Sequence, residues 1–136
     1  MSLLRSIKQL LNKAAPKLPP RPLPPPDPEP EESAVPEISV AALQAALASD
    51  QPPLLLDIRE PFEWNQVRIP GALHIPMNDL PARLDDLPQT VSMVVLCAHG
   101  SRSYAVAHFL LENGYTARSL TGGITAWHQQ GGMVEQ

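Results

Sequence analysis

The chain of 136 residues has a single cysteine, Cys97, and no lysine beyond residue 38. One cysteine excludes an internal disulfide framework and a cysteine-based zinc site within one chain, but it leaves a reactive thiol open. The chain also lacks an uninterrupted apolar run of about 18 residues, the length that a membrane-spanning helix requires. From Ile38 onward five arginines face nine acidic residues, so we expect no nucleic-acid partner for that part.

Proline is abundant, with 17 in the chain and ten of them between Pro16 and Pro36. Proline removes an amide donor and fixes φ, so this stretch is neither a helix nor an inner strand. We interpret residues 16–36 as a semi-rigid polyproline linker with a reach of about 60 Å. Residues 16–21 also match the PxxPxR pattern of an SH3 ligand. Chance matches are expected in so proline-rich a segment, so the linker interpretation is favoured.

Residues 1–15 have the pattern of a short basic amphipathic helix. An isolated helix of this length is marginal in water, so it needs its own domain, a partner protein or an anionic membrane to lie on. The same features are typical of an organelle transit peptide, which stays open as an alternative to a cytoplasmic location. The apolar face carries Leu3, Leu4, Ile7, Leu10 and Leu11.

Residues 37–134 show alternating helix-like and strand-like patterns, which predict an α/β domain with a mostly parallel central sheet flanked by helices. The expected strands are 54–57, 72–75, 93–96 and 117–120. The expected helices are one from 40 to near 50 with Ser39 as its N-cap, 61–64, one from 78 or 79 to 87, one that follows Gly100 and stops at Asn113-Gly114, and 123–130.

Two reactive side chains follow expected strands. Asp57 ends one strand and Cys97 follows another, and ligands of open α/β sheets bind at the carboxyl ends of strands. Cys97 is followed by a glycine-containing loop and a helix start, whose amides would favour a thiolate and bind an anionic group. The alternative is that Cys97 is a small buried apolar residue that ends a core strand.

Cys97-Ala98-His99-Gly100-Ser101-Arg102-Ser103 resembles the C-x-x-G-x-R-S active-site loop of rhodanese-like sulfurtransferases. Further landmarks of that family are matched in order, which makes the resemblance more specific than one short motif. They are Leu56-Asp57-Ile58-Arg59-Glu60, Glu63-Trp64, Ile69-Pro70-Gly71-Ala72, Asn113-Gly114-Tyr115 and Gly122-Gly123-Ile124-Thr125-Ala126-Trp127.

The resemblance implies a single rhodanese-like domain of three layers, with Cys97 as the catalytic nucleophile. Its thiolate would take the outer sulfur of thiosulfate or another small-molecule or protein donor and pass it from a persulfide to cyanide or a thiol acceptor. No cofactor or metal is implied, and His74, His108 and His128 show no metal-ligand spacing. The loop residues expected to bind the substrate are Ala98, His99, Gly100, Ser101, Arg102 and Ser103.

The sequence alone leaves several residue roles open. Asp57 and Arg59 match a pair beside the loop, either supporting the site or forming a purely structural salt bridge. His99 is either a proton-transfer or binding group or a solvent-facing imidazole, and Ser103 is favoured as a helix cap. Ala98 replaces the basic or aromatic residue of many relatives, which predicts poor affinity for free thiosulfate.

Two competing functions follow from the same residues. Phosphatases of related architecture use a Cys-x5-Arg loop that wraps a tetrahedral oxyanion, whereas Cys97 and Arg102 form the shorter Cys-x4-Arg. The second alternative is a non-enzymatic scaffold or interaction module, targeted by residues 1–15. An intact Cys97 and loop glycine argue against that alternative, because a scaffold needs neither.

Val67-Arg68 replaces the Gly-His that often precedes Ile-Pro-Gly-Ala, a change expected to alter a surface turn.

Overall fold

A computed structural model describes residues 34–136 of the chain. The predicted helix 1–15 and almost all of the linker 16–36 lie outside the described residues, so both stay predictions. Within the described part, no helix is long and apolar enough to cross a membrane.

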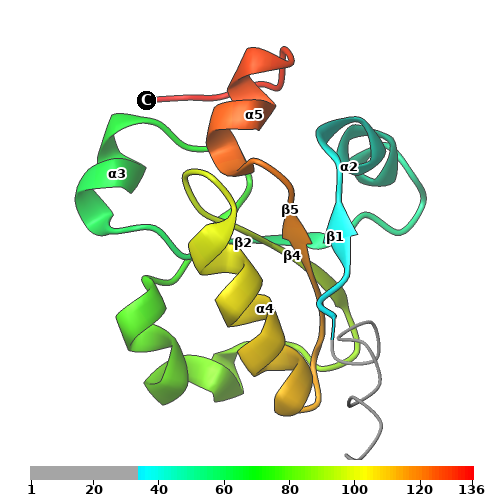
Figure 1. Cartoon of the computed structure of the whole chain (residues 1–136), viewed down its shortest axis with the longest axis vertical. Helices are drawn as coiled ribbons and strands as arrows, with labels where there is room; N and C mark the ends of the chain where they lie inside the picture. Colours follow the sequence, from blue (N-terminus) through cyan, green and yellow to red (C-terminus); the bar gives the residue numbers. More distant parts are fainter. Residues whose placement is uncertain (1–33) are drawn as a thin grey trace, which may run out of the picture. The chain divides into compact units, whose positions relative to one another are not determined.

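Five parallel strands form one sheet in the order β1-β5-β4-β2-β3 (Figure 1). Helical segments connect them, so the predicted parallel α/β architecture is confirmed. The elements in chain order are β1 (Glu37–Ile38), α2 (Val40–Leu47), β2 (Leu54–Asp57), α3 (Pro61–Gln66), β3 (Leu73–His74), the 3-10 segment η2 (Met77–Asp86), β4 (Ser92–Leu96), α4 (Ser101–Glu112), β5 (Thr116–Leu120) and α5 (Gly123–Gln129).

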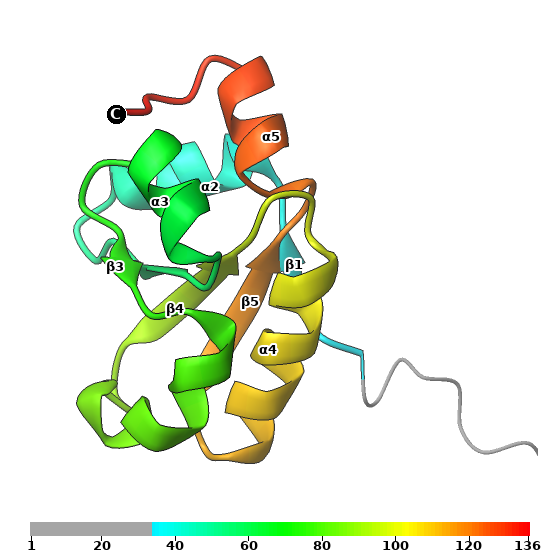
Figure 2. The same ribbon diagram turned by 90° about the vertical axis from the view of Figure 1, so that its left-hand side faces the viewer.

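Helices cover both faces of the sheet, which gives three layers (Figure 2). On one face η2 and α4 bury Leu80, Val106 and Leu110 against alternate residues of β2 and β4. On the other face α2 and α5 bury Leu43 and Trp127. The central strands are buried on both sides, which explains why their sequences are continuously apolar and do not alternate.

Local sequence accounts for most helix starts. The Ser39 hydroxyl accepts a hydrogen bond from the amide of Ala42 at 3.1 Å, as an N-cap does, so the prediction for α2 is confirmed. Helix α3 begins at Pro61, whose missing amide hydrogen is not needed in a first turn.

The structure differs from the sequence-based expectation in three places. The predicted helix near 78–87 is a 3-10 segment with a kink at Arg83, because Pro81 lies inside it and donates no amide hydrogen bond. Strand β3 is shorter than predicted. The sequence did not predict β1, whose two residues pair with β5, and core packing begins at Val35, whose amide donates to the Tyr104 hydroxyl at 3.3 Å.

Candidate active site

Cys97 directly follows β4, in the loop that leads to α4. Figure 1 shows this loop in yellow before the start of α4. Cys97 Sγ accepts hydrogen bonds from the amides of Gly100 at 3.1 Å and Ser103 at 3.3 Å. The loop can turn its amides inward because Gly100 has a φ of 107°, a conformation that side-chain-bearing residues rarely adopt. The predicted cradle of backbone donors around the thiol is therefore present.

This environment favours the thiolate. Burial alone would raise the pKa of Cys97, because a charged sulfur loses hydration. The Ser103 hydroxyl and the amides of Ser103, Gly100 and His99 outweigh burial and hold the pKa of Cys97 below the usual value of a thiol. A thiolate is the form that attacks sulfur and carbon electrophiles.

The sequence favoured Ser103 as a helix cap. That prediction is wrong, because Gly100 is the N-cap of α4. The Ser103 hydroxyl lies 3.5 Å from Cys97 Sγ and 2.8 Å from the hydroxyl of Ser119 on β5, and it reaches the Gly100 carbonyl at 3.1 Å. Both serines are fully buried. No sequence pattern pointed to Ser119, because its contact depends on the register of β5 beside β4.

The loop is fixed from behind by the start of α5. The amides of Ile124 and Thr125 donate to the carbonyls of Cys97 and Ala98 at 2.9 and 3.1 Å. Gly123 makes this approach possible, since a side chain at that position would collide with both carbonyls. The Gly122-Gly123 landmark of the sequence thus serves to dock the active-site loop.

Asp57 and Arg59 form a buried ion pair, with Arg59 Nη2 2.7 Å from Asp57 Oδ2. Arg59 also donates from its side chain to the carbonyls of Glu63 at 3.3 Å and Val67 at 2.7 Å. The pair therefore ties the backbone of α3 to the carboxyl end of β2. Its hydrogen bonds join the two side chains to each other and to backbone, not to the sulfur, so its effect on the site passes through α3.

Helix α3 brings a carboxylate to the loop that the sequence did not assign. Glu63 pairs with Arg102 through two hydrogen bonds, Nη1 to Oε1 at 2.9 Å and Nη2 to Oε2 at 3.0 Å. The Glu63-Trp64 landmark marked Glu63 in the sequence, but nothing linked it to Arg102, which lies 39 residues away. The pairing lowers the pKa of Glu63, chiefly through its hydrogen bond to Arg102, and raises the pKa of Arg102.

The side chains of the other predicted loop residues make no hydrogen bond to the sulfur. His99 and Ser101 are exposed and Ala98 is half-buried. His74, away from the loop, stacks on Trp64 with ring centroids 4.6 Å apart, so it acts in packing. Within residues 34–136, no three His, Cys, Asp or Glu side chains are grouped to hold a metal.

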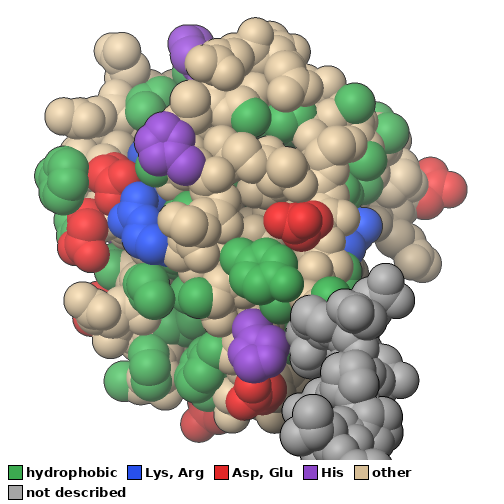
Figure 3. Space-filling model, viewed as in Figure 1, with side chains coloured by type: hydrophobic (Ala, Val, Ile, Leu, Met, Phe, Trp, Pro, Cys, Tyr) green, Lys and Arg blue, Asp and Glu red, His purple; other side chains and the backbone are tan. Residues whose placement is uncertain are grey.

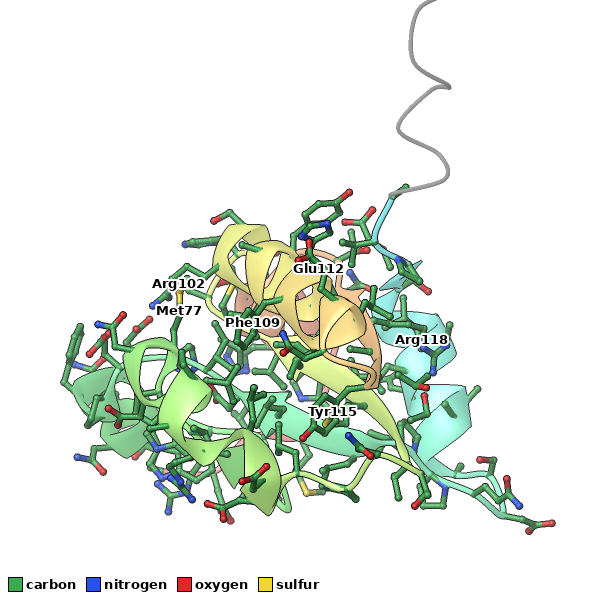
Figure 4. All side chains as sticks on the ribbon, turned by 90° about the horizontal axis from the view of Figure 1, so that it is seen from below. Met77, Arg102, Phe109, Glu112, Tyr115 and Arg118 are labelled. Carbon is green, nitrogen blue, oxygen red and sulfur yellow. The ribbon has the colours of Figure 1, made fainter. Side chains whose placement is uncertain are left out.

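An apolar cavity of about 320 Å³ lies between η2 and α4. Its walls on α4 begin one turn after Arg102 on the same face of the helix. Figure 4 shows Met77 and Phe109 between these elements, with Arg102 labelled at the same edge. No charged residue lines the cavity, whose walls are Met77, Asn78, Leu80, Pro81, Ala105, Val106 and Phe109.

Comparisons with known proteins agree with this geometry. A family model described as rhodanese-like domain matches residues 39–130. A sulfurtransferase of Allochromatium vinosum is 40% identical over 96 residues, which cover 70% of this chain and 90% of that protein. The putative sulfurtransferase YtwF of Bacillus subtilis is 37% identical over 91 residues, covering 67% and 88%. A crystal structure of a rhodanese-related protein from Thermoplasma volcanium superposes with a TM-score of 0.69 at 32% identity, covering 74% of this chain and 97% of that one.

Proposed function

This chain belongs to the rhodanese-like family, and we propose that it is a sulfurtransferase that carries sulfane sulfur as a persulfide on Cys97. The observation that supports the proposal most directly is the hydrogen bonding of Cys97 Sγ. A buried thiol at the end of a central strand accepts two amide hydrogen bonds and lies beside a buried hydroxyl. A cysteine that served only to fill the core would need none of these donors.

The proposed first step is attack of the Cys97 thiolate on the outer sulfur of the donor. With thiosulfate, a sulfur–sulfur bond forms to Cys97, the bond between the two donor sulfurs breaks with its electron pair, and sulfite leaves. With a hydropersulfide RSSH, the terminal SH is transferred and the thiolate RS⁻ leaves. In the second step cyanide or an acceptor thiolate attacks the outer sulfur, and Cys97 leaves as the thiolate.

The amides of the loop suit both negatively charged forms of Cys97 in this cycle, the thiolate and the persulfide. They stabilise the Cys97 thiolate before the reaction and the negative persulfide sulfur after it, and they are in position before the donor binds. Cys97 is only 1% exposed, so a slim sulfur atom reaches it more readily than a bulky group. The persulfide extends the nucleophile outward by one atom, which brings the transferable sulfur closer to an acceptor.

Phosphatase chemistry fits this site less well. Its Cys-x4-Arg loop is one residue shorter than the Cys-x5-Arg loop of the related phosphatases. The Arg102 guanidinium is also directed to Glu63, with both terminal nitrogens hydrogen-bonded to the carboxylate. The pair uses two of the five guanidinium N–H donors and cancels the positive charge, so Arg102 would bind a phosphoryl group less strongly than a free arginine would.

Intact-mass measurement tests the proposal. The full chain is incubated with thiosulfate and, separately, with glutathione persulfide, and we expect a mass gain of one sulfur atom that cyanide removes. Cys97→Ala should show no gain. If no donor adds sulfur to the wild-type chain, the sulfurtransferase proposal fails and the scaffold alternative is favoured.

We also propose that residues 1–15 recruit the domain to an anionic membrane or to a partner protein. The basic and apolar faces of the predicted helix support this role. Sedimentation with vesicles containing phosphatidylserine should be stronger for the full chain than for its Ile7→Glu variant. Equal sedimentation of the full chain and the variant would contradict membrane recruitment. Equal capture of candidate partner proteins by the two would contradict partner recruitment by the helix.

A further inference from the structure

The ion pair between Glu63 and Arg102 lies at the edge of the active-site loop. Arg102 is 33% exposed and Glu63 is 18% exposed, so the pair is partly shielded from water. Positively and negatively charged surfaces are in contact on the side of the molecule where α3 lies (Figure 3). Glu63 also accepts a hydrogen bond from the Glu60 amide at 3.0 Å, which fixes the carboxylate on α3.

This pairing cancels the charge of the cation in the loop. Arg102 lowers the pKa of Glu63, so the carboxylate is ionised at neutral pH and the pair has no net charge. The carboxylate of Glu60 lies close enough to act on Arg102 as well. The electrostatic attraction of this edge for an anion is therefore far weaker than the presence of an arginine in the motif implies.

Other cations near the site do not replace Arg102 in the described part of the chain. Arg59 is buried and held by Asp57 and by two carbonyls of α3. The cavity between η2 and α4 has no charged lining residue. His99, the other basic side chain of the loop, is exposed to water.

We propose that Glu63 is a specificity-determining residue that disfavours the thiosulfate dianion and favours sulfane-sulfur donors of lower charge. The proposal rests on the sulfurtransferase function proposed above. Thiosulfate concentrates two negative charges next to the sulfur that it transfers, whereas organic thiosulfonates carry one. Hydropersulfides carry one or none at the reacting end. Glu63 repels the second charge and also takes up two of the five guanidinium N–H donors that could otherwise bind it.

Paired donors test this selectivity. Thiosulfate and methanethiosulfonate both transfer a terminal sulfur but differ by one charge, and their kcat/KM values are compared at pH 8, where exposed imidazoles are neutral. In Glu63→Gln the ratio of thiosulfate to methanethiosulfonate should rise about tenfold. Glutamine keeps the shape and can still accept the Glu60 amide hydrogen bond, so the start of α3 is preserved.

Two further variants separate the ion pair from a general charge effect. Glu60→Gln removes a carboxylate from the same helix end without breaking a hydrogen bond to Arg102, and it should change the ratio less than threefold. Adding Arg102→Gln to Glu63→Gln should abolish the gain. An unchanged ratio in Glu63→Gln, or an equal gain in Glu60→Gln, overturns the proposal.

A binding measurement decides the proposal even if no sulfur is transferred. Sulfate, an unreactive dianion, is used to protect Cys97 from alkylation by the neutral reagent iodoacetamide. Half-protection of Glu63→Gln should need about tenfold less sulfate than half-protection of the wild-type chain. If both need the same concentration, Glu63 does not exclude dianions. If protection changes as expected but no donor forms a persulfide, the proposed function fails and the role of Glu63 in anion exclusion stands.

Discussion

The buried hydroxyl of Ser103 makes the most direct prediction about Cys97 reactivity. In Ser103→Ala, Cys97 Sγ loses a hydroxyl 3.5 Å away, which accepts from the thiol and can turn to donate to the thiolate, but it keeps the amides of Gly100 and residue 103. The hydroxyl contributes to the lowered pKa of Cys97, so its removal raises that pKa. Less thiolate is then present at neutral pH.

The size of the effect follows from the geometry. A hydrogen bond to a charged group contributes about 1.5–3 kcal/mol, and the Ser103 hydroxyl is also shared with the Gly100 carbonyl and Ser119, so we assign about 1 kcal/mol to this one. That corresponds to about fivefold less thiolate below the pKa of Cys97. The variant also removes the hydroxyl that Ser119 contacts, which should lower the free energy of unfolding by about 1–3 kcal/mol.

The assay is alkylation of Cys97 by iodoacetamide as a function of pH, followed by intact mass. Because the pKa of Cys97 is lowered in the folded protein, the wild-type rate should fall as pH drops through a value below the usual pKa of a thiol. The fall should move to higher pH in Ser103→Ala. Ser101→Ala, which removes an exposed hydroxyl of the same loop, serves as the control. Identical pH profiles for wild type and Ser103→Ala would refute the assigned role of the hydroxyl.

The remaining predictions concern the supports of the site. Arg59→Leu leaves the Asp57 carboxylate buried without its partner and should lower the free energy of unfolding by about 3–5 kcal/mol in urea titrations. Arg83→Gln, which breaks the exposed pair with Asp86, should change it by less than about 1 kcal/mol, and similar losses in both would contradict the argument. Gly123→Ala forces a methyl group against the Cys97 and Ala98 carbonyls, so persulfide formation measured by mass should fall at least about tenfold. Unchanged sulfur uptake in this variant would show that α5 does not position the loop.

The sequence predicted the parts of the fold that depend on local patterns. The central strands and α4 follow from apolar runs and from Gly100, and the contiguous loop motif was enough to locate the candidate nucleophile. Strand β1 escaped prediction because two residues carry no periodicity and are held as a strand only by pairing with β5. The helix type of η2 was missed because the apolar spacing of Leu80 and Leu84 suits an α-helix, whereas Pro81 prevents one.

The residues of the site that escaped prediction all act across long sequence separations. Ser119 reaches Ser103 only because β5 lies beside β4 in a particular register. Glu63 meets Arg102 only because the buried Asp57–Arg59 pair holds α3 next to the loop. A motif reports the residues that are contiguous in the chain, so it indicated the nucleophile and its amides and left their distant partners unassigned.

Different residues therefore affect the reactivity of Cys97 and the selectivity of the site for its sulfur donor. The Cys97 thiolate is stabilised by the Ser103 hydroxyl and by the amides of Gly100 and Ser103, which all belong to the loop and the start of α4. The charge that a donor meets depends instead on Glu63, a single side chain on a helix outside the loop. On the role proposed for Glu63, a substitution on α3 changes the class of donor without altering the nucleophile, so the loop motif alone does not determine the donor of this chain.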